Sequence, residues 1–365
     1  MSYVATGTIQ NGKVSADLTD FPVYIDLSDM PASFWSAVSD GGGDIRCYKS
    51  DGTTELAREV VSCATSTETG ELHVKFSGTL SSSVDTEIQI HADGVSADYA
   101  VTATYGRNAV WSDYGLVFHG DDATDSTGNN TYTETGSPSY SAGKLGNALD
   151  AARSGEYLRS SSSPTGIPTG KPNFSTTQWI KYNTLYGYSI GLSWGIDATP
   201  YGRGYFPVIG DGTPSTWGTF WAGGSGYGNI NSSSPASTTA TWYHAVTTYD
   251  QTTHRMFIDS AARGTTTYTG SNIVNSYCNI NKHPNVTSLG IDGQLDEVRI
   301  ANFTYSSDWI TTEYNNQSAP TTFYSVTAVG GGATGYANKV MGVASANIGK
   351  VMGVATANIS KVMGV

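Results

Sequence analysis

Basic residues and long apolar stretches are both scarce in this chain of 365 residues. Lys and Arg number 19 against 31 Asp and Glu, the formal net charge is -12, and no Lys/Arg cluster occurs. A nucleic-acid surface needs a basic stripe, so we expect no DNA or RNA partner. No apolar run is long enough to cross a bilayer, so we expect no membrane insertion. The N-terminal MSYVATGTIQNGKV has neither a charged start nor an apolar centre, so we also expect no secretory signal.

Cysteine and histidine are also sparse, with three Cys and six His. Cys47 and Cys63 are open to two interpretations, a disulfide within the N-terminal region or two free thiols. Cys278 is expected to be a lone buried thiol. No CxxC spacing exists and the histidines are scattered, so the sequence predicts no structural zinc site. We expect His119, His244 and His254 to be satisfied histidines in the core or at its rim.

What the chain does contain is typical of strands and tight turns. There are 23 Tyr and 43 Gly, while only 14% of residues are charged. Chains rich in Tyr, Thr, Ser and Gly favour β-structure over helix. The length exceeds what one small core requires, so we expect an all-β protein of two domains with an additional segment.

The N-terminal region, residues 1–104, reads as an antiparallel β domain. Short alternating segments are separated by turn signals such as Asp51-Gly52, and one helical segment is expected over residues 31–38. The stretches YIDLSDMPASFWSAVSDGGGDIRCYKSDGTTELAREVV and LHVKFSGTL…TEIQIHADG resemble an uncharacterised bacterial and phage domain family. Its members often precede laminin-G-like domains. The resemblance implies a β-sandwich and no known chemistry.

Residues 105–324 carry four motifs in one order. They are LVFHGDDATDSTGNNTYTETGSPSYSAGKLGNALDAARSGEYLRS, FSTTQWIKYNT, TWYHAVTTYDQTTHRMFIDSAARG and LGIDGQLDEVRIANFTYSSDWITTEYNN. In this order they resemble the concanavalin-A-like sandwich of the laminin-G-like, jelly-roll type. Independently, residues 242–249 and 254–259 predict a strand pair across a four-residue turn. The short spacing of turns indicates a sandwich and not βαβ units.

The last motif contains an acidic pair at the head of a predicted strand. Simple alternation places Leu295, Glu297 and Arg299 on one face and Asp296, Val298 and Ile300 on the other. Adjacent residues of a strand point to opposite faces, so Asp296 and Glu297 do not form the paired carboxylates of a glycosidase. We therefore expect no enzymatic activity. A short helix should follow over residues 306–314, with Ser306 or Ser307 as its N-cap.

An Asp-rich loop at residues 121–130 is the candidate metal site. Calcium takes six to eight oxygen ligands from flexible, carboxylate-rich turns. Sandwiches that this chain resembles often hold calcium between such a loop and the acidic strand near the C-terminus, which implies the ligands Asp121, Asp125, Asn129 and Asp296. The alternative is that Asp and Asn form Asx turns within the loop. The sequence leaves both open.

An aromatic, Gly-rich region from residue 186 to 227 is the candidate glycan-binding face. Sugar rings present apolar C–H faces that stack on aromatic side chains. The candidates are Tyr201, Tyr205, Trp217, Trp221 and Tyr227. The alternative is that these rings fill the sandwich core or contact a neighbouring subunit.

The C-terminal segment, residues 325–365, contains a Gly-rich break and three copies of KVMGV at a period of 11 residues. A Gly in each unit argues against helix, so we expect short extended segments with a turn at each Gly. Similar repeats occur on structural proteins of tailed bacteriophages, a resemblance that implies assembly through Lys339, Val340, Met341, Lys350, Val351, Met352, Lys361, Val362 and Met363.

Together these patterns predict a non-enzymatic structural protein of a phage virion, in a capsid decoration, a tail or a fibre. Other virion proteins and further copies of the chain would be its partners through the repeats. Host-surface glycans would meet the laminin-G-like domain, with calcium as the implied cofactor. The alternative is a carbohydrate-binding adhesin at a bacterial cell surface or secreted from the cell.

Overall fold

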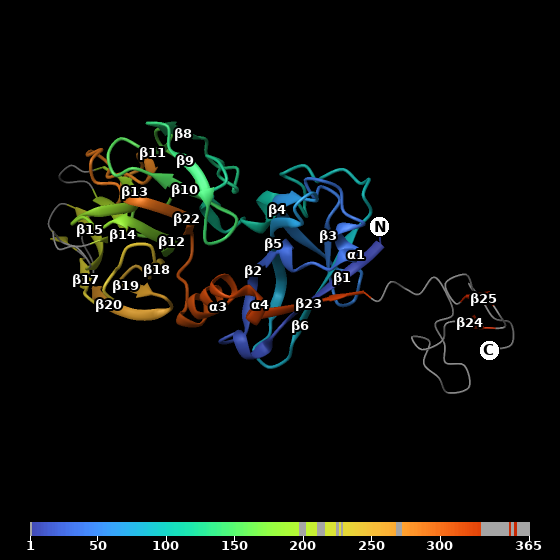
Figure 1. Cartoon of the computed structure of the whole chain (residues 1–365). Coiled ribbons are helices and arrows are strands. Elements are labelled where there is room, and N and C mark those ends of the chain that lie inside the picture. The colour runs from blue at the N-terminus through green and yellow to red at the C-terminus, as the bar shows by residue number, and fades with distance from the viewer. Residues whose placement is uncertain are drawn as a thin grey trace.

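The computed structural model describes residues 2–196, 202–209, 216–223, 226–227, 229–267, 272–329, 350–351 and 354–355. Its described part is nearly all β-structure, as predicted, and consists of two lobes (Figure 1). The N-terminal lobe is blue to cyan apart from one orange-red strand near the C-terminal end of the chain, and the second lobe runs from green to orange. No helix among the described residues is both long enough and apolar enough to cross a bilayer.

The first lobe is built on one seven-stranded antiparallel sheet, in the order β2-β5-β4-β3-β6-β1-β23. Its strands are β1 (Ser2–Ile9), β2 (Leu18–Asp26), β3 (Arg46–Lys49), β4 (Glu55–Ala64), β5 (Thr69–Leu80), β6 (Thr86–Ala92) and β23 (Tyr324–Ala328). The expected helical segment appears as the single turn α1 (Ala32–Trp35). Alternate apolar side chains such as Val23, Leu72 and Ile90 fill its core.

The second lobe is a sandwich of two eight-stranded sheets. One has the order β20-β19-β18-β12-β22-β10-β9, with β7 also paired to β22, and the other β16-β15-β14-β13-β21-β11-β8, with β17 on β15. The strands of the first of these sheets are β7 (Tyr114–Phe118), β9 (Ser139–Ala142), β10 (Asn147–Ala151), β12 (Phe174–Thr184), β18 (Trp242–Tyr249), β19 (Thr253–Ile258), β20 (Ala261–Thr267) and β22 (Asp292–Ala301). Those of the other are β8 (Tyr132–Thr135), β11 (Tyr157–Ser160), β13 (Ser189–Gly195), β14 (Gly202–Ile209), β15 (Trp217–Gly223), β16 (Gly226–Tyr227), β17 (Ile230–Ser232) and β21 (Cys278–Ile280). Their inward side chains form one apolar core.

The chain then returns to the first lobe. Helix α3 (Ser307–Ser318) lies between the lobes, and α4 (Pro320–Phe323) leads into β23, which pairs with β1 (Figure 1). Asn316 of α3 exchanges hydrogen bonds with the main chain of Tyr24, at 2.8 and 2.9 Å. The expected boundary between residues 324 and 325 therefore falls at the start of a strand that completes the first sheet.

Local predictions that rest on turn and cap chemistry are confirmed. Ser306 caps α3, since its Oγ accepts a hydrogen bond from the Trp309 amide at 3.0 Å. Asp51 accepts main-chain N–H bonds in the turn that joins β3 and β4. Asp250 does the same between β18 and β19, which form the predicted strand pair.

The two lobes share buried apolar surface. One cluster of buried residues combines side chains of the first sheet with Tyr114 and Val117 of β7, Ala301 of β22 and Ile310 of α3. Phe21 of β2 packs on Trp309 with ring centroids 4.9 Å apart. One outer face of the second lobe is thus covered by α3 and the first sheet, and the junction is a packed interior.

Candidate functional site: a buried carboxylate–histidine cluster at the lobe junction

A β-bulge in β22 determines where its acidic residues point. Glu297 has a positive φ of 50°, and the pairing register with β12 shifts between Thr177 and Trp179. One extra residue in the strand interrupts the alternation of faces. Leu295, Val298 and Ile300 consequently all enter the sandwich core.

The prediction that Asp296 and Glu297 lie on opposite faces is therefore wrong. Both carboxyl groups are buried on the side of β22 that meets the first lobe, where the charges of both act on Glu71 of β5. Asp296 Oδ2 accepts main-chain N–H bonds from Lys144 and Leu145, at 2.7 and 2.8 Å. The alternation of faces holds within each part of the strand that flanks the bulge, but it fails across the bulge itself.

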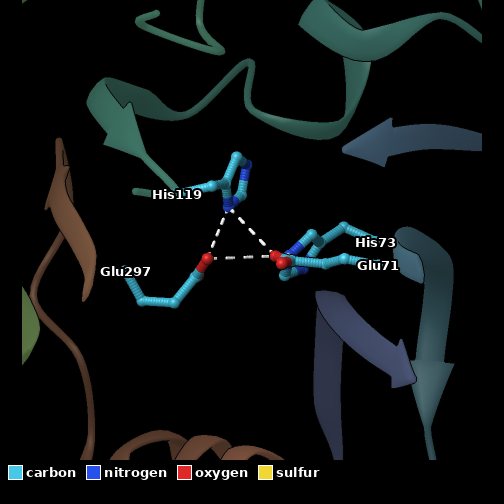
Figure 2. Close-up of side chains that lie close together, drawn as sticks. All are labelled: Glu71, His73, His119 and Glu297. Atoms are coloured by element: carbon cyan, nitrogen blue, oxygen red, sulfur yellow. Dashed lines mark hydrogen bonds and ion pairs between the residues drawn. The ribbon is translucent and has the colours of Figure 1, made fainter. Parts of the chain in front are cut away.

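Four side chains converge at this junction (Figure 2). Glu71 and His73 occupy alternate positions of β5 and so project from the same face, while His119 follows β7 and Glu297 stands on the bulge. His119 Nδ1 lies 2.5 Å from Glu297 Oε1 and 3.5 Å from Glu71 Oε1. His73 Nε2 lies 2.8 Å from Glu71 Oε1 and 3.8 Å from Glu297 Oε1. All four atoms fall within 4.8 Å of one another, and all four residues are buried.

A second layer of polar groups holds this cluster in place. Glu59 Oε2 lies 3.0 Å from His119 Nε2, and Glu59 also accepts hydrogen bonds from the Trp111 indole and the Ser126 hydroxyl. On the other side, Arg299 pairs with Glu297 Oε2 and with Glu313 Oε1 of α3. The layer thus draws on both lobes and on α3.

Acidic groups outnumber positive ones in this interior. The buried carboxyl groups are those of Glu59, Glu71, Asp296, Glu297 and Glu313. In the described part of the chain, Arg299 is the permanently charged side chain that pairs with any of them. Burial, reinforced by the Glu297 charge, raises the pKa of Glu71 well above its usual range. Burial and the same charge also raise the pKa of Asp296. Protons or a cation must balance the excess.

The two histidines of the cluster are shifted in opposite directions. Burial lowers the pKa of His73 well below its usual value. Burial also acts against the charge on His119, but the Glu297 and Glu59 carboxylates outweigh it and hold the pKa of His119 well above its usual value. For Glu297 itself, Arg299 and His119 outweigh burial and lower the pKa. The His73 and His119 rings, which are stacked with centroids 4.6 Å apart, thus have pKa values shifted in opposite directions.

The four residues expected to bind calcium lie outside the group of converging ligands that the described residues form. That group of Asp, Glu, His and Cys side chains consists of Glu71, His73, His119 and Glu297. Asp125 Oδ1 instead accepts N–H bonds from Val117 and Thr127, and Asn129 donates to the Tyr114 carbonyl. Asp121 Oδ1 accepts from Asn147 at 2.7 Å. The Asx-turn alternative describes Asp125, while calcium binding stays a prediction.

Trp217 does not fit the expected glycan-binding face. Its side chain is fully buried, its indole donates to the Pro235 carbonyl at 3.0 Å, and its ring packs on Tyr182 and Tyr243. The prediction for Trp217 is therefore wrong, because alternation on β15 turns this ring into the sandwich core. The backbones of Tyr205, Trp221 and Tyr227 belong to β14, β15 and β16. Their side chains, and all of Tyr201, lie outside the described residues.

Two tyrosines at the edge of the same aromatic region are exposed. Tyr186 and Tyr188 precede β13 with 39% and 42% of their surface exposed. The Arg153 guanidinium lies over the Tyr186 ring, 4.5 Å from its centroid, and donates to the Gly187 carbonyl. We refer to Tyr186, Tyr188 and Arg153 as the tyrosine patch. At the other end of β13, Tyr277 is 38% exposed beneath Arg159.

Two further sets of expectations concern the repeats and the thiols. Lys350 and Val351 form β24, which pairs with β25 (Val354–Ala355). Lys339, Val340, Met341, Met352, Lys361, Val362 and Met363 lie outside the described residues. Cys47 and Cys63 are buried free thiols, which settles that alternative against a disulfide, and Cys278 is buried as expected.

Residues 154–311 match the family model of the concanavalin A-like lectin/glucanases superfamily. The second lobe thus has the concanavalin-A-like fold that the motifs predicted. No curated protein matches the chain.

Solved structures with a similar fold include several binding domains. One is domain 4 of an extracellular arabinanase from Geobacillus stearothermophilus in complex with arabinotriose, with 19% identity, 55% of this chain and 97% of that chain covered, and a TM-score of 0.45. Another is the ligand binding domain of botulinum neurotoxin serotype D in complex with N-acetylneuraminic acid, with 12% identity, 58% and 53% covered, and a TM-score of 0.44. The binding domain of Paraclostridial Mosquitocidal Protein 1 is 10% identical, with 56% of this chain and 52% of that chain covered and a TM-score of 0.45. The chain spans about half the length of these toxin domains.

Proposed function

We propose that the chain is a non-enzymatic structural protein of a bacteriophage particle whose concanavalin-A-like domain binds glycans of the host surface. The family match supports the carbohydrate-binding part, and the 11-residue repeats support the particle. The tyrosine patch is the observation that carries the glycan site. It combines exposed aromatic rings with a guanidinium, the groups that stack on sugar C–H faces and bind hydroxyls.

The tyrosine patch is also rigidly held, which favours recognition at low entropic cost. Arg153 is tied to the Ser189 hydroxyl at 3.0 Å and to the Gly187 carbonyl, so it fixes the loop on which both rings stand. One face of the Tyr186 ring meets this arginine, and the exposed remainder is available to a sugar. We therefore propose the tyrosine patch as the sugar-binding position in place of Trp217, whose ring lies in the sandwich core.

A glycan array probed with the labelled full chain tests this site. We expect binding to at least one class of bacterial surface glycan, and an affinity about 10-fold or more lower in Tyr186→Ala/Tyr188→Ala, equivalent to about 1.4 kcal/mol. Tyr277→Ala is the matched control, because Tyr277 is equally exposed beneath an arginine at the other end of β13. An array without any bound glycan, or equal binding by the double variant, would reject the site.

The absence of catalysis and the role of the repeats need separate measurements. Incubation with each bound polysaccharide should release no reducing sugar. The full chain should associate in native mass spectrometry, and substitution of Val340, Val351 and Val362 by Asp should leave monomers that still bind glycan. Monomeric wild-type protein with intact glycan binding would favour the adhesin alternative.

A further inference from the structure

We infer that the lobe junction binds one divalent transition-metal ion, zinc by its donor set, through Glu71, His73, His119 and Glu297. Two ligands come from β5 of the first lobe and two from the sandwich (Figure 2). The proposal is independent of glycan binding. Its consequence would be a metal cross-link between the two lobes.

The donor atoms have the type and spacing that zinc requires. Zinc binds imidazole nitrogen and carboxylate oxygen at about 2.0–2.2 Å and prefers four ligands in a tetrahedron, whose ligand atoms then lie roughly 3.3 Å apart. The N–O pairs of the cluster are 2.5 to 3.8 Å apart, and all four donor atoms lie within 4.8 Å of one another, so small side-chain shifts would bring them to that separation. The set offers two nitrogens and two oxygens. An all-oxygen cation such as calcium would leave both histidines unused.

An unsatisfied buried atom is a second, separate indication. Glu71 is fully buried with its carboxylate directed into the cluster, yet its Oε2 has no hydrogen-bond partner. Buried polar groups without partners are rare in native proteins. Gly146, at a positive φ of 48°, leaves room for this carboxylate, because a Cβ there would collide with Glu71 Oε2. An ion at the centre would engage the Glu71 carboxylate and offset the excess of buried acid.

The surrounding layer resembles the support of protein metal sites. Ligating histidines commonly direct their other ring nitrogen to a carboxylate, which fixes the ring and increases its basicity. Glu59 stands in that position on His119 Nε2 at 3.0 Å and is itself held by Trp111 and Ser126. Arg299 likewise fixes the second oxygen of Glu297. The four ligands are therefore oriented by groups that do not reach the centre.

His119 connects the cluster to a surface cavity. This cavity, of about 230 Å³, is lined by His119 together with Glu59 and Asp121 among others. His119 is 5% exposed at this wall, whereas Glu71 and His73 are fully enclosed. Four protein ligands fill a tetrahedral site, so the geometry assigns a structural role and not a catalytic one.

Metal binding by the full chain tests the inference. The protein is stripped with a chelator and titrated with zinc, and separately with cobalt(II), whose visible spectrum distinguishes four-coordinate from six-coordinate sites. We expect one zinc per chain, an intense four-coordinate cobalt spectrum, and a melting temperature several degrees higher with zinc than without it.

Variants then identify the ligands. His119→Gln and Glu71→Gln should each weaken zinc binding by about 100-fold or more, and Glu59→Gln by about 10-fold through the orientation of His119. His254→Gln is the matched control, since His254 is a fully buried histidine of β19 beside Thr219 and should leave the stoichiometry unchanged.

The inference is overturned if the stripped wild-type chain neither takes up stoichiometric metal nor gains thermal stability from zinc. A six-coordinate cobalt spectrum, or zinc binding by His119→Gln equal to that of the wild type, would also overturn it. The cluster would then be a network balanced by protons alone. The cobalt spectrum of the wild type decides the matter even if a variant does not fold.

Discussion

The Asp125 turn and the Glu71–His119 cluster are both acidic and buried, yet their carboxylates are stabilised differently. Asp125 is 3% exposed and accepts main-chain N–H bonds from Thr127 in its own loop and from Val117 in the preceding strand β7. Glu71 Oε1 is hydrogen-bonded to His73 Nε2 on its own strand and meets His119 and Glu297, which come from the second lobe. Nearby main-chain N–H groups satisfy the hydrogen bonds of a carboxylate in a turn. A carboxylate buried among side chains from distant strands instead needs a counter-charge or a proton.

The largest expected effect comes from removing the cation of the junction. Arg299→Met leaves Glu297 and Glu313 buried without their partner, so we expect the free energy of unfolding to fall by about 3–5 kcal/mol in urea titration. Arg255→Met is the control, because Arg255 pairs with Asp250 at the surface and should cost about 0–1 kcal/mol. Similar losses in both variants would show that the buried ion pairs of the junction stabilise the fold no more than a surface ion pair does.

The second effect is a pH dependence of the chelator-treated protein. The folded pKa values of Glu71, Asp296 and His119 are raised, so the folded state retains protons that the unfolded chain has released above pH of about 7. Stability from these groups is present at lower pH and is lost as the pH rises through the folded values. The lowered groups, His73 and Glu297, are deprotonated in both states in this window.

We therefore expect the melting temperature of the stripped chain to decrease between pH 7 and 9, as followed by circular dichroism. The decrease should be smaller in Glu71→Gln, which has no proton to lose at this position. A flat profile from pH 7 to 9 in the stripped wild type would contradict the raised pKa values.

A moderate effect is expected at the turn itself. Asp125→Ala leaves the amides of Val117 and Thr127 without their acceptor and should reduce the free energy of unfolding by about 1–3 kcal/mol. The loss should be the same with and without added calcium. A calcium-dependent rise in melting temperature that Asp125→Asn abolishes would instead establish the predicted calcium site. It would also show that main-chain N–H groups alone do not satisfy Asp125.

The smallest effect concerns the buried cysteine thiols, which take no part in the cluster at the lobe junction. Burial raises the pKa of Cys47 and Cys278 to about 12, so their thiols should remain unreactive toward a disulfide reagent at pH 8 in the native protein. Unfolding should expose all three thiols to the reagent. Rapid native labelling, or a change in metal uptake after labelling in denaturant and refolding, would implicate a thiol in the junction.

Sequence patterns predicted the elements better than the site. The Ser306 cap and the Asp250 turn were predictable because each is completed within a few residues. The cluster was not, since His119 and Glu297 are 178 positions apart and no spacing rule links them. The adjacent acidic residues Asp296 and Glu297 on β22 were a usable signal, but alternation without a bulge directed them to opposite faces.

The sequence by itself determined an all-β chain, its turns and caps, and a concanavalin-A-like domain, because these follow from local conformational preference and the order of the motifs. The tertiary structure decided that Trp217 is core, that residues 324–328 complete the first sheet, and that Glu71, His73, His119 and Glu297 meet. Those outcomes depend on strand register, on one bulge and on the docking of two lobes. Such long-range packing leaves no periodic trace in the chain.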